Sequence, residues 1–150
     1  MRALVIGASG QVGGALVNAL AARGHTVTAT YATVPVAGAT KLDLRDHQAV
    51  ERLIRDVTPD WVFCPGGLTR VDWCEDHPEA AAQINAAGPL AAARAGAALG
   101  ASFVYYSSEY VFDGERGPYG EEDPHAPSAS TGGPSFRRSR GSWWRSRARS

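Results

Sequence analysis

The sequence lacks the features that would stabilise a small secreted protein or anchor one in a membrane. Only two cysteines, Cys64 and Cys74, occur among its 150 residues. Two are too few for a disulfide framework, so a reducing compartment, the cytoplasm, is expected. No apolar run approaches the ~20 residues that cross a bilayer, and the first apolar run is too short for a cleavable signal. The cysteines and histidines show no metal-ligand spacing. We therefore expect a cytoplasmic globular protein with no metal site.

Charge is unevenly distributed, although the formal net charge is zero. Residues 1–126 hold all 15 acidic residues and nine basic ones, whereas residues 127–150 hold six arginines and no acid. This second segment is rich in Ser and Gly and has no apolar periodicity, which predicts a disordered tail over 129–150. An arginine-rich tail with Trp143 and Trp144 could bind nucleic acid. We disfavour that alternative because the tail has no fold of its own.

The start of the chain reads as a strand that turns sharply into a helix. Three glycines, Gly7, Gly10 and Gly13, follow the apolar residues 3–6 at regular spacing. Such glycines allow a tight turn, close approach of a pyrophosphate, and close packing of helix on strand, respectively. The helix N-terminus then offers free N–H groups to the phosphates. The pattern predicts dinucleotide binding; the alternative is a glycine-rich turn that binds nothing.

Strand and helix patterns alternate along the chain, which predicts an α/β fold with a parallel sheet. We expect a Rossmann-like doubly wound sheet over residues 1–128, incomplete at about five strands. Asp46 should cap the second helix, and the segment from Val71 to Pro78 reads as a polar connection. The expected strands are 3–6, 25–31, 39–42, 61–64 and 101–106, and the expected helices are 11–22, 48–57 and 79–100, the last interrupted at Gly88–Pro89.

The end of the second strand bears on the choice of dinucleotide. In NAD-selective sites an acid there binds the ribose hydroxyls. Here the residues from Thr30 to Thr33 include neither an acid nor an arginine. The missing acid removes a repulsion against a 2′-phosphate, which slightly favours NADP and leaves NAD open.

Several motifs together resemble one known group of proteins. They are GASGQVG at 7–13, LDL at 42–44, RVD at 70–72 with Glu75 and Pro78, Ile84–Asn85, SSEYVFDG at 107–114, and then Pro118–Tyr119, Glu121–Asp123 and Pro127. Over about residues 1–128 the chain resembles the extended short-chain dehydrogenase/reductase superfamily, and within it the dTDP-4-dehydrorhamnose reductases and the regulatory beta subunit of methionine adenosyltransferase.

The resemblance implies a set of site residues. Ser108 would bind the substrate carbonyl, and Asp43 would contact adenine, although it could equally cap a turn. Asn85 reads as a structural residue that bonds the backbone of a neighbouring strand. The cofactor-binding residues implied are Gly7, Ser9, Gly10, Gln11, Val12, Thr30, Asp43, Leu44, Pro65, Gly66 and Gly67. Pro65 departs from the small residue that the family has there.

The catalytic Tyr-x-x-x-Lys pair of the family is absent. Tyr119 is the last tyrosine, and Lys41 is the only lysine. The pair is due just after Pro127, and codons for residues 129–136 can be chosen whose other reading frame encodes Ile-Tyr-Gly-Arg-Thr-Lys-Leu. We hypothesise a frameshift near residue 128; the alternative is a short protein with a basic tail. Stop codons directly after residue 128 in the other frame would exclude the frameshift.

Two functions remain open from the sequence. The first is descent from an NAD(P)-dependent reductase of a 4-keto sugar nucleotide, in a chain made inactive by the missing pair. The second is a nucleotide-binding regulatory protein that docks on a partner enzyme. In either case the fifth strand would be an uncovered edge, which invites self-association.

Overall fold

The computed structural model describes residues 1–107, 112, 115, 117–120, 122 and 123. They fall into two units. The sheet unit consists of residues 1–68 and 83–106, and the second unit contains residues 69–82 and the described residues from 107 on. The predicted boundary at 128 and the predicted disordered tail lie outside the described residues.

The sheet unit is built on five parallel strands, as the alternating pattern predicts. They are β1 (Arg2–Ile6), β2 (Thr26–Tyr31), β3 (Thr40–Lys41), β4 (Trp61–Cys64) and β5 (Ser102–Tyr105). Their order is β3-β2-β1-β4-β5, and Val5 of β1 stands between Ala29 and Phe63. The central strand β1 is buried on both faces, which explains its unbroken apolar run. The Rossmann-like α/β class is confirmed, and β5 is the edge strand of the described sheet.

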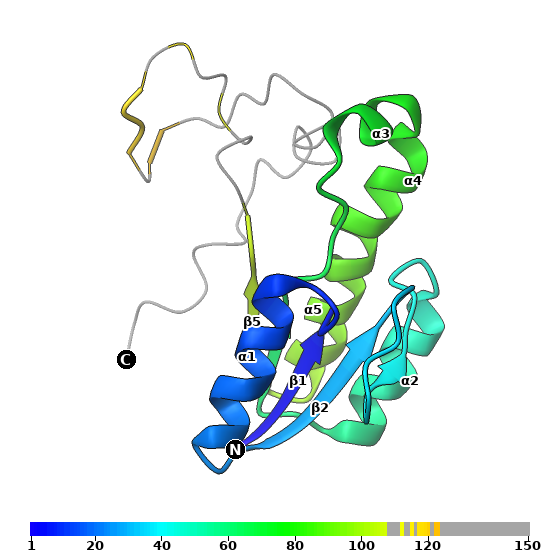
Figure 1. The fold of residues 1–150 in the computed structure, drawn as a ribbon, viewed down its shortest axis with the longest axis vertical. Helices are drawn as coiled ribbons and strands as arrows, with labels where there is room; N and C mark the ends of the chain where they lie inside the picture. Colours follow the sequence, from blue (N-terminus) through cyan, green and yellow to red (C-terminus); the bar gives the residue numbers. More distant parts are fainter. Residues whose placement is uncertain (108–111, 113–114, 116, 121, 124–150) are drawn as a thin grey trace. The chain divides into compact units, whose positions relative to one another are not determined.

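Helices cover the two faces of the sheet separately (Figure 1). On one face α1 (Gln11–Ala22) packs Leu16, Val17 and Leu20 against Ala3 and Val5. The other face is covered by α2 (His47–Val57) and α5 (Gly88–Ala98). The larger core lies there and is made of Leu4, Ile6, Leu42, Leu44, Val50, Ile54, Val62, Cys64 and Ala92. This is the doubly wound arrangement.

Helix α2 begins where the sequence predicts a cap. The Asp46 carboxylate accepts a hydrogen bond from the Ala49 N–H at 2.9 Å. One face of the helix then carries Val50 and Ile54, both fully buried, with Leu53 beside them. The spacing of these residues is that of an amphipathic helix on a core.

Two expectations about the middle of the chain are wrong. Residues 71–78 are not a plain polar connection, because they contain α3 (Val71–Asp76) and the start of α4 (Pro78–Ala82). The Trp73 ring stacks on His77 with centroids 4.3 Å apart, and Cys74 is buried, so apolar contacts support this short helix.

Gly88–Pro89 also does not interrupt the long helix. Pro89 stands in the first turn of α5, the part of a helix in which proline is best tolerated. The irregular stretch lies just before, in the π-helical segment η1 (Gln83–Ala87).

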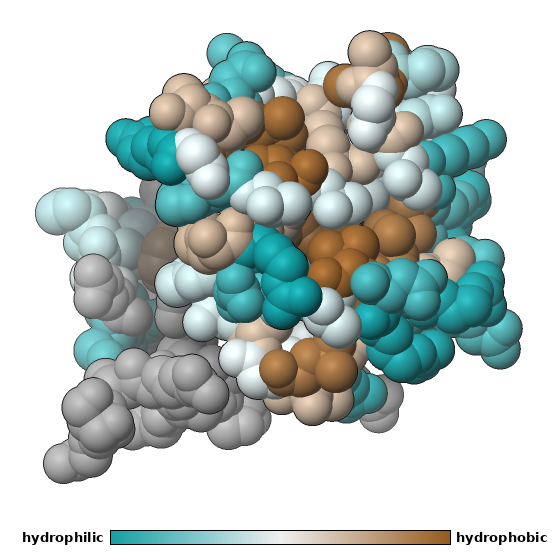
Figure 2. All heavy atoms as spheres, turned by 90° about the horizontal axis from the view of Figure 1, so that it is seen from below, coloured by the Kyte–Doolittle hydropathy of each residue, from teal (hydrophilic) through white to brown (hydrophobic). Residues whose placement is uncertain are grey.

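Exposed apolar side chains are scattered over the sheet unit. Trp61 is 38% exposed and Leu99 is 44% exposed. Seen from the end at which the strands begin, hydrophobic surface is broken up by hydrophilic groups (Figure 2). None of the described helices is long and apolar enough to cross a membrane.

Candidate functional site

The turn between β1 and α1 has the geometry that its glycines predict. Gly7 has φ +102°, a conformation that side chains disfavour. A Cβ on Gly13 would lie 2.8 Å from the carbonyl carbon of Gly7 and 2.9 Å from Cα of Ala8. The N–H of Gly10 donates to the Gly7 oxygen at 3.2 Å. The chain therefore folds back on itself here, so that the helix starts directly against the strand end.

The outer side of this turn is open. A Cβ on Gly10 would meet only the Gly7 oxygen, at 3.6 Å, and Ser9, Gly10, Gln11 and Val12 are all exposed. Gly10 is the N-cap and supplies no side-chain cap, and the first turn of α1 carries no acid. The first N–H groups of the helix are thus left to an external acceptor, and the helix dipole favours an anion there.

Thr30 lies behind the turn rather than on its open side. The residue is 1% exposed, and its carbonyl oxygen accepts the N–H groups of Gly7 at 3.2 Å and Ala8 at 2.6 Å. Its hydroxyl donates to the Val5 oxygen at 3.4 Å. This geometry gives Thr30 a role in holding the turn, whereas Tyr31, Ala32 and Thr33 continue toward the surface.

The loop after β4 packs directly on the glycine turn. The Gly66 N–H donates to the Ile6 oxygen at 2.9 Å, and a Cβ on Gly7 would lie only 2.6 Å from Cα of Gly66. Pro65 and Gly66 are half-buried and Gly67 is exposed. The structure therefore brings the two glycine-rich segments together at the carboxyl ends of β1 and β4, where ligands bind in open parallel sheets.

Asn85 in η1 fixes the far end of this loop. Its side-chain oxygen accepts the Leu68 N–H at 2.7 Å, and its side-chain nitrogen donates to the Leu68 oxygen at 2.9 Å. The Tyr105 hydroxyl donates to the backbone oxygen of Asn85 at 2.8 Å. The structural reading of Asn85 therefore agrees with the geometry, although its partner is the loop beyond β4 and not a strand.

Asn85→Ala is expected to loosen this loop. Two hydrogen bonds would be lost at about 1 kcal/mol each, so the free energy of unfolding should fall by about 2 kcal/mol, and the Leu68 amide should exchange faster with solvent. Hydrogen exchange and denaturant melts measure both effects. The exposed Asn18 on α1 provides the matched control, and equal losses for Asn18→Ala and Asn85→Ala would contradict the role of Asn85.

Asp43 and Leu44 follow β3, so they too lie beyond the carboxyl end of a strand. The Asp43 carboxylate is bonded by the Arg45 guanidinium, with Nε 3.0 Å from both oxygens, and by the Arg45 N–H at 2.9 Å. The hydrogen bond from Arg45 lowers the pKa of Asp43. Leu44 is 7% exposed and belongs to the core, so only its backbone could face a ligand. An adenine contact by Asp43 remains a prediction, and it would compete with Arg45.

Ser108 lies outside the described residues, three positions after the end of β5. Its predicted contact with a substrate carbonyl therefore stays a prediction. Tyr105, at the end of the strand, has its pKa raised to about 12 by burial and by the neighbouring Cys64. A tyrosine in that state does not release its proton near neutral pH.

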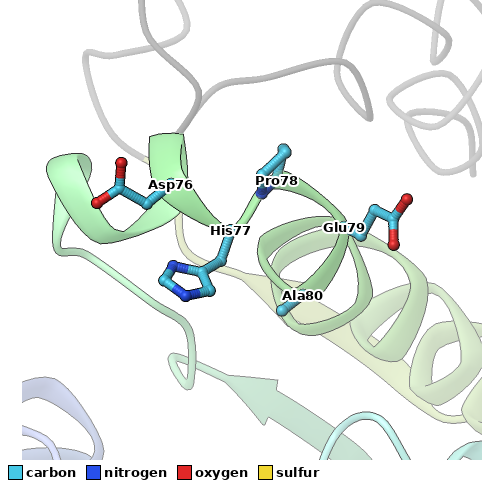
Figure 3. Close-up of a pocket in the computed structure, with 5 residues that line it drawn as sticks. All are labelled: Asp76, His77, Pro78, Glu79 and Ala80. Atoms are coloured by element: carbon cyan, nitrogen blue, oxygen red, sulfur yellow. The ribbon is translucent and has the colours of Figure 1, made fainter.

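The second unit contains a pocket lined by Asp76, His77, Pro78, Glu79 and Ala80 (Figure 3). The Asp76 and Glu79 carboxylates point away from each other there. The His77 ring is held by Trp73 through stacking and through Nδ1, which lies 3.0 Å from the Trp73 oxygen. Within the described part of the chain, no group of three or more His, Cys, Asp or Glu could hold a metal ion. The glycine turn is thus the better candidate site.

Comparison with known proteins relates the chain to sugar-nucleotide reductases. A dTDP-4-dehydrorhamnose reductase from Burkholderia thailandensis is 40% identical over 130 residues, which are 85% of this chain and 40% of that protein. The methionine adenosyltransferase 2 subunit beta of Rattus norvegicus is 40% identical over 87 residues, 58% of this chain and 26% of that one. The chain thus spans less than half the length of these relatives.

Solved structures agree with the sequence relatives. The crystal structure of a dTDP-4-dehydrorhamnose reductase from Bacillus anthracis, in complex with NADP, superposes with a TM-score of 0.78 at 28% identity. The superposition covers 90% of this chain and 46% of that one. The family model described as RmlD substrate binding domain matches residues 1–135. By this match, with which its Rossmann-like α/β fold agrees, the chain belongs to the RmlD substrate binding domain family, that of the dTDP-4-dehydrorhamnose reductases.

Proposed function

We propose that this chain binds the pyrophosphate of NADP(H) or NAD(H) at the turn from Gly7 to Val12. The observation that carries the proposal is the open, uncapped start of α1 above a turn in which Gly7 and Gly13 leave no room for side chains. Backbone N–H groups and the helix dipole supply the binding, so the site is contained in the sheet unit. The Bacillus anthracis relative was crystallised with NADP.

Gly10→Val should abolish most of this binding without unfolding the protein. A branched side chain would occupy the open side of the turn, where the pyrophosphate lies. A Cβ at this position does not clash with the protein itself, because its nearest neighbour, the Gly7 oxygen, would lie 3.6 Å away in ordinary contact. We expect the dissociation constants for NADPH and NADH to rise about tenfold or more, equivalent to about 1.4 kcal/mol. Isothermal titration measures them.

Ala15→Val is the matched control, because Ala15 is exposed on the same helix. It adds the same side chain away from the turn and should leave the affinity unchanged. Equal affinity for Gly10→Val and the wild type would reject the site. Comparing NADPH with NADH in the same titrations tests the preference for NADP that follows from the absence of an acid between Thr30 and Thr33.

The reaction that this site would serve is reduction of a 4-keto sugar nucleotide by hydride transfer. Membership of the family supports this proposal, with Ser108 as the group that would bind the carbonyl. The chain itself should be inactive, because it has no Tyr-x-x-x-Lys pair.

A second candidate is a nucleotide-binding regulatory protein. The 87-residue match to the methionine adenosyltransferase beta subunit supports it, since that protein is by its name a subunit of an enzyme. Affinity purification of the tagged chain distinguishes the candidates. A single stoichiometric enzyme partner, held through repeated washes, favours regulation, and its absence favours a reductase remnant.

A further inference from the structure

Strand β3 ends beside the end of β2, close to the glycine turn. Tyr31 and Lys41 are the last residues of these two strands, and they stand opposite each other in the parallel register. The residue before Tyr31, Thr30, accepts the N–H groups of Gly7 and Ala8 with its carbonyl oxygen. The end of β2 is thus joined to the turn on one side and to Lys41 on the other.

Lys41 is exposed and lies on the same face of the sheet as α1. Val27 of β2 packs into the small cluster under α1. By alternation Tyr31, four residues later, shares that face with its register partner Lys41. Leu42 gives the same result independently, because it is buried in the larger core cluster on the opposite face. The Lys41 ammonium group is therefore on the face that presents the open start of α1.

Most other basic side chains of the sheet unit lie away from the end of β2. Arg2 begins β1, at the amino ends of the strands. The helices account for Arg23 at the end of α1, Arg52 and Arg55 in α2, and Arg94 in α5. Arg45 follows β3, but its Nε lies 3.0 Å from both carboxylate oxygens of Asp43. Lys41 is thus the cation best placed to meet a ligand beside the end of β2.

Asp43 connects Lys41 with the predicted adenine contact. The pKa of Asp43 is lowered mainly by the hydrogen bond from Arg45, and the charge of Lys41 acts in the same direction. Lys41 is therefore close enough to act on that carboxylate. In sheets of this kind the adenosine ribose meets the end of the second strand, where an arginine can accommodate a 2′-phosphate. Residues 30–33 include no arginine, and Lys41 stands beside them on the next strand.

We propose that Lys41 binds the 2′-phosphate of NADP(H) and so makes this chain prefer the phosphorylated dinucleotide. The inference rests on the proposed function, since it needs the pyrophosphate at the turn from Gly7 to Val12. β3 lies two strand spacings, about 10 Å, from β1. The strand between them, β2, is the one whose end meets the ribose. Lysine binds phosphate as a point charge, and NADH has no 2′-phosphate, so Lys41 distinguishes the two dinucleotides.

Isothermal titration of Lys41→Gln with NADPH and with NADH tests the inference. The dissociation constant for NADPH should rise about fivefold, as expected for an exposed ion pair, and that for NADH should stay as in the wild type. An unchanged affinity for NADH also shows that the variant is folded. Lys41→Arg should keep the preference for NADPH, because a guanidinium also binds phosphate.

Arg52→Gln is the matched control, because it removes the same charge from an exposed position in α2. It should change neither dissociation constant. Equal effects of Lys41→Gln and Arg52→Gln on NADPH, or equal losses of NADPH and NADH in Lys41→Gln, would overturn the role of Lys41. A wild type that binds NADH as tightly as NADPH would overturn this inference alone. A wild type that binds neither would reject the proposed function and this inference with it.

Discussion

Gly13→Ala is expected to lower the free energy of unfolding by about 2 kcal/mol or more and to abolish dinucleotide binding. The added methyl group would lie 2.8 Å from the carbonyl carbon of Gly7 and 2.9 Å from Cα of Ala8. Both neighbours are backbone, so neither can rotate away, and α1 must shift off the end of β1. Overpacking of this kind costs about 1–3 kcal/mol, occasionally more, and it outweighs the ~1 kcal/mol gained by alanine in a helix.

Gly14→Ala is the control for this prediction. It introduces the same methyl group one position along the same helix, where it would meet only the Ala8 oxygen, at 3.4 Å. Helix propensity should then make the substitution neutral or stabilising. Denaturant melts give both free energies, and titration with NADPH gives the affinities. If Gly13→Ala matched Gly14→Ala in both, the close packing of α1 on β1 would not be needed for the site.

The parts of the fold that the sequence predicts well depend on local patterns. The boundaries of α1 and β4 are as expected, because each is set by neighbours a few residues away: Gly10 and Arg23–Gly24 around the helix, Asp60 and Pro65 around the strand. The cap of α2 by Asp46 is equally local. The need for glycine at position 13 is local as well, since the atoms that leave no room for a side chain there belong to Gly7 and Ala8, whereas Gly7 is also crowded by Gly66, which is distant in sequence.

The interactions that position the site are not local, and the sequence did not reveal them. Asn85 meets Leu68 across 17 residues and Tyr105 across 20. No periodicity connects such residues, so neither partner could be predicted. Similarly, the role of Thr30 behind the turn depends on the β1–β2 register, which pairs it with Ile6. A threonine at a strand end carries no signal that distinguishes support of the turn from contact with a ligand.

The described residues offer no replacement for the missing catalytic pair. Lys41 is in β3, at the opposite edge of the sheet from β5, and four strand spacings of about 4.8 Å separate those strands by about 19 Å. The Tyr105 hydroxyl donates a hydrogen bond to the backbone oxygen of Asn85, and the pKa of Tyr105 is raised to about 12, chiefly by burial. A general acid needs a pKa nearer the working pH. Neither cause of that shift, burial or the neighbouring Cys64, is a cation that would lower the pKa of Tyr105.

We therefore expect no measurable oxidation of NADPH by this 150-residue chain with a 4-keto sugar nucleotide. Loss of a general acid alone costs about 10²–10⁴-fold in rate, and here the cation that would tune it is missing as well. The assay should be run beside a version in which the chain after residue 128 follows the reading frame that encodes Tyr-x-x-x-Lys. Turnover by that version alone, lost on Ser108→Ala, is the expected result. Turnover by the 150-residue chain, also lost on Ser108→Ala, would show that this chain contains another proton donor.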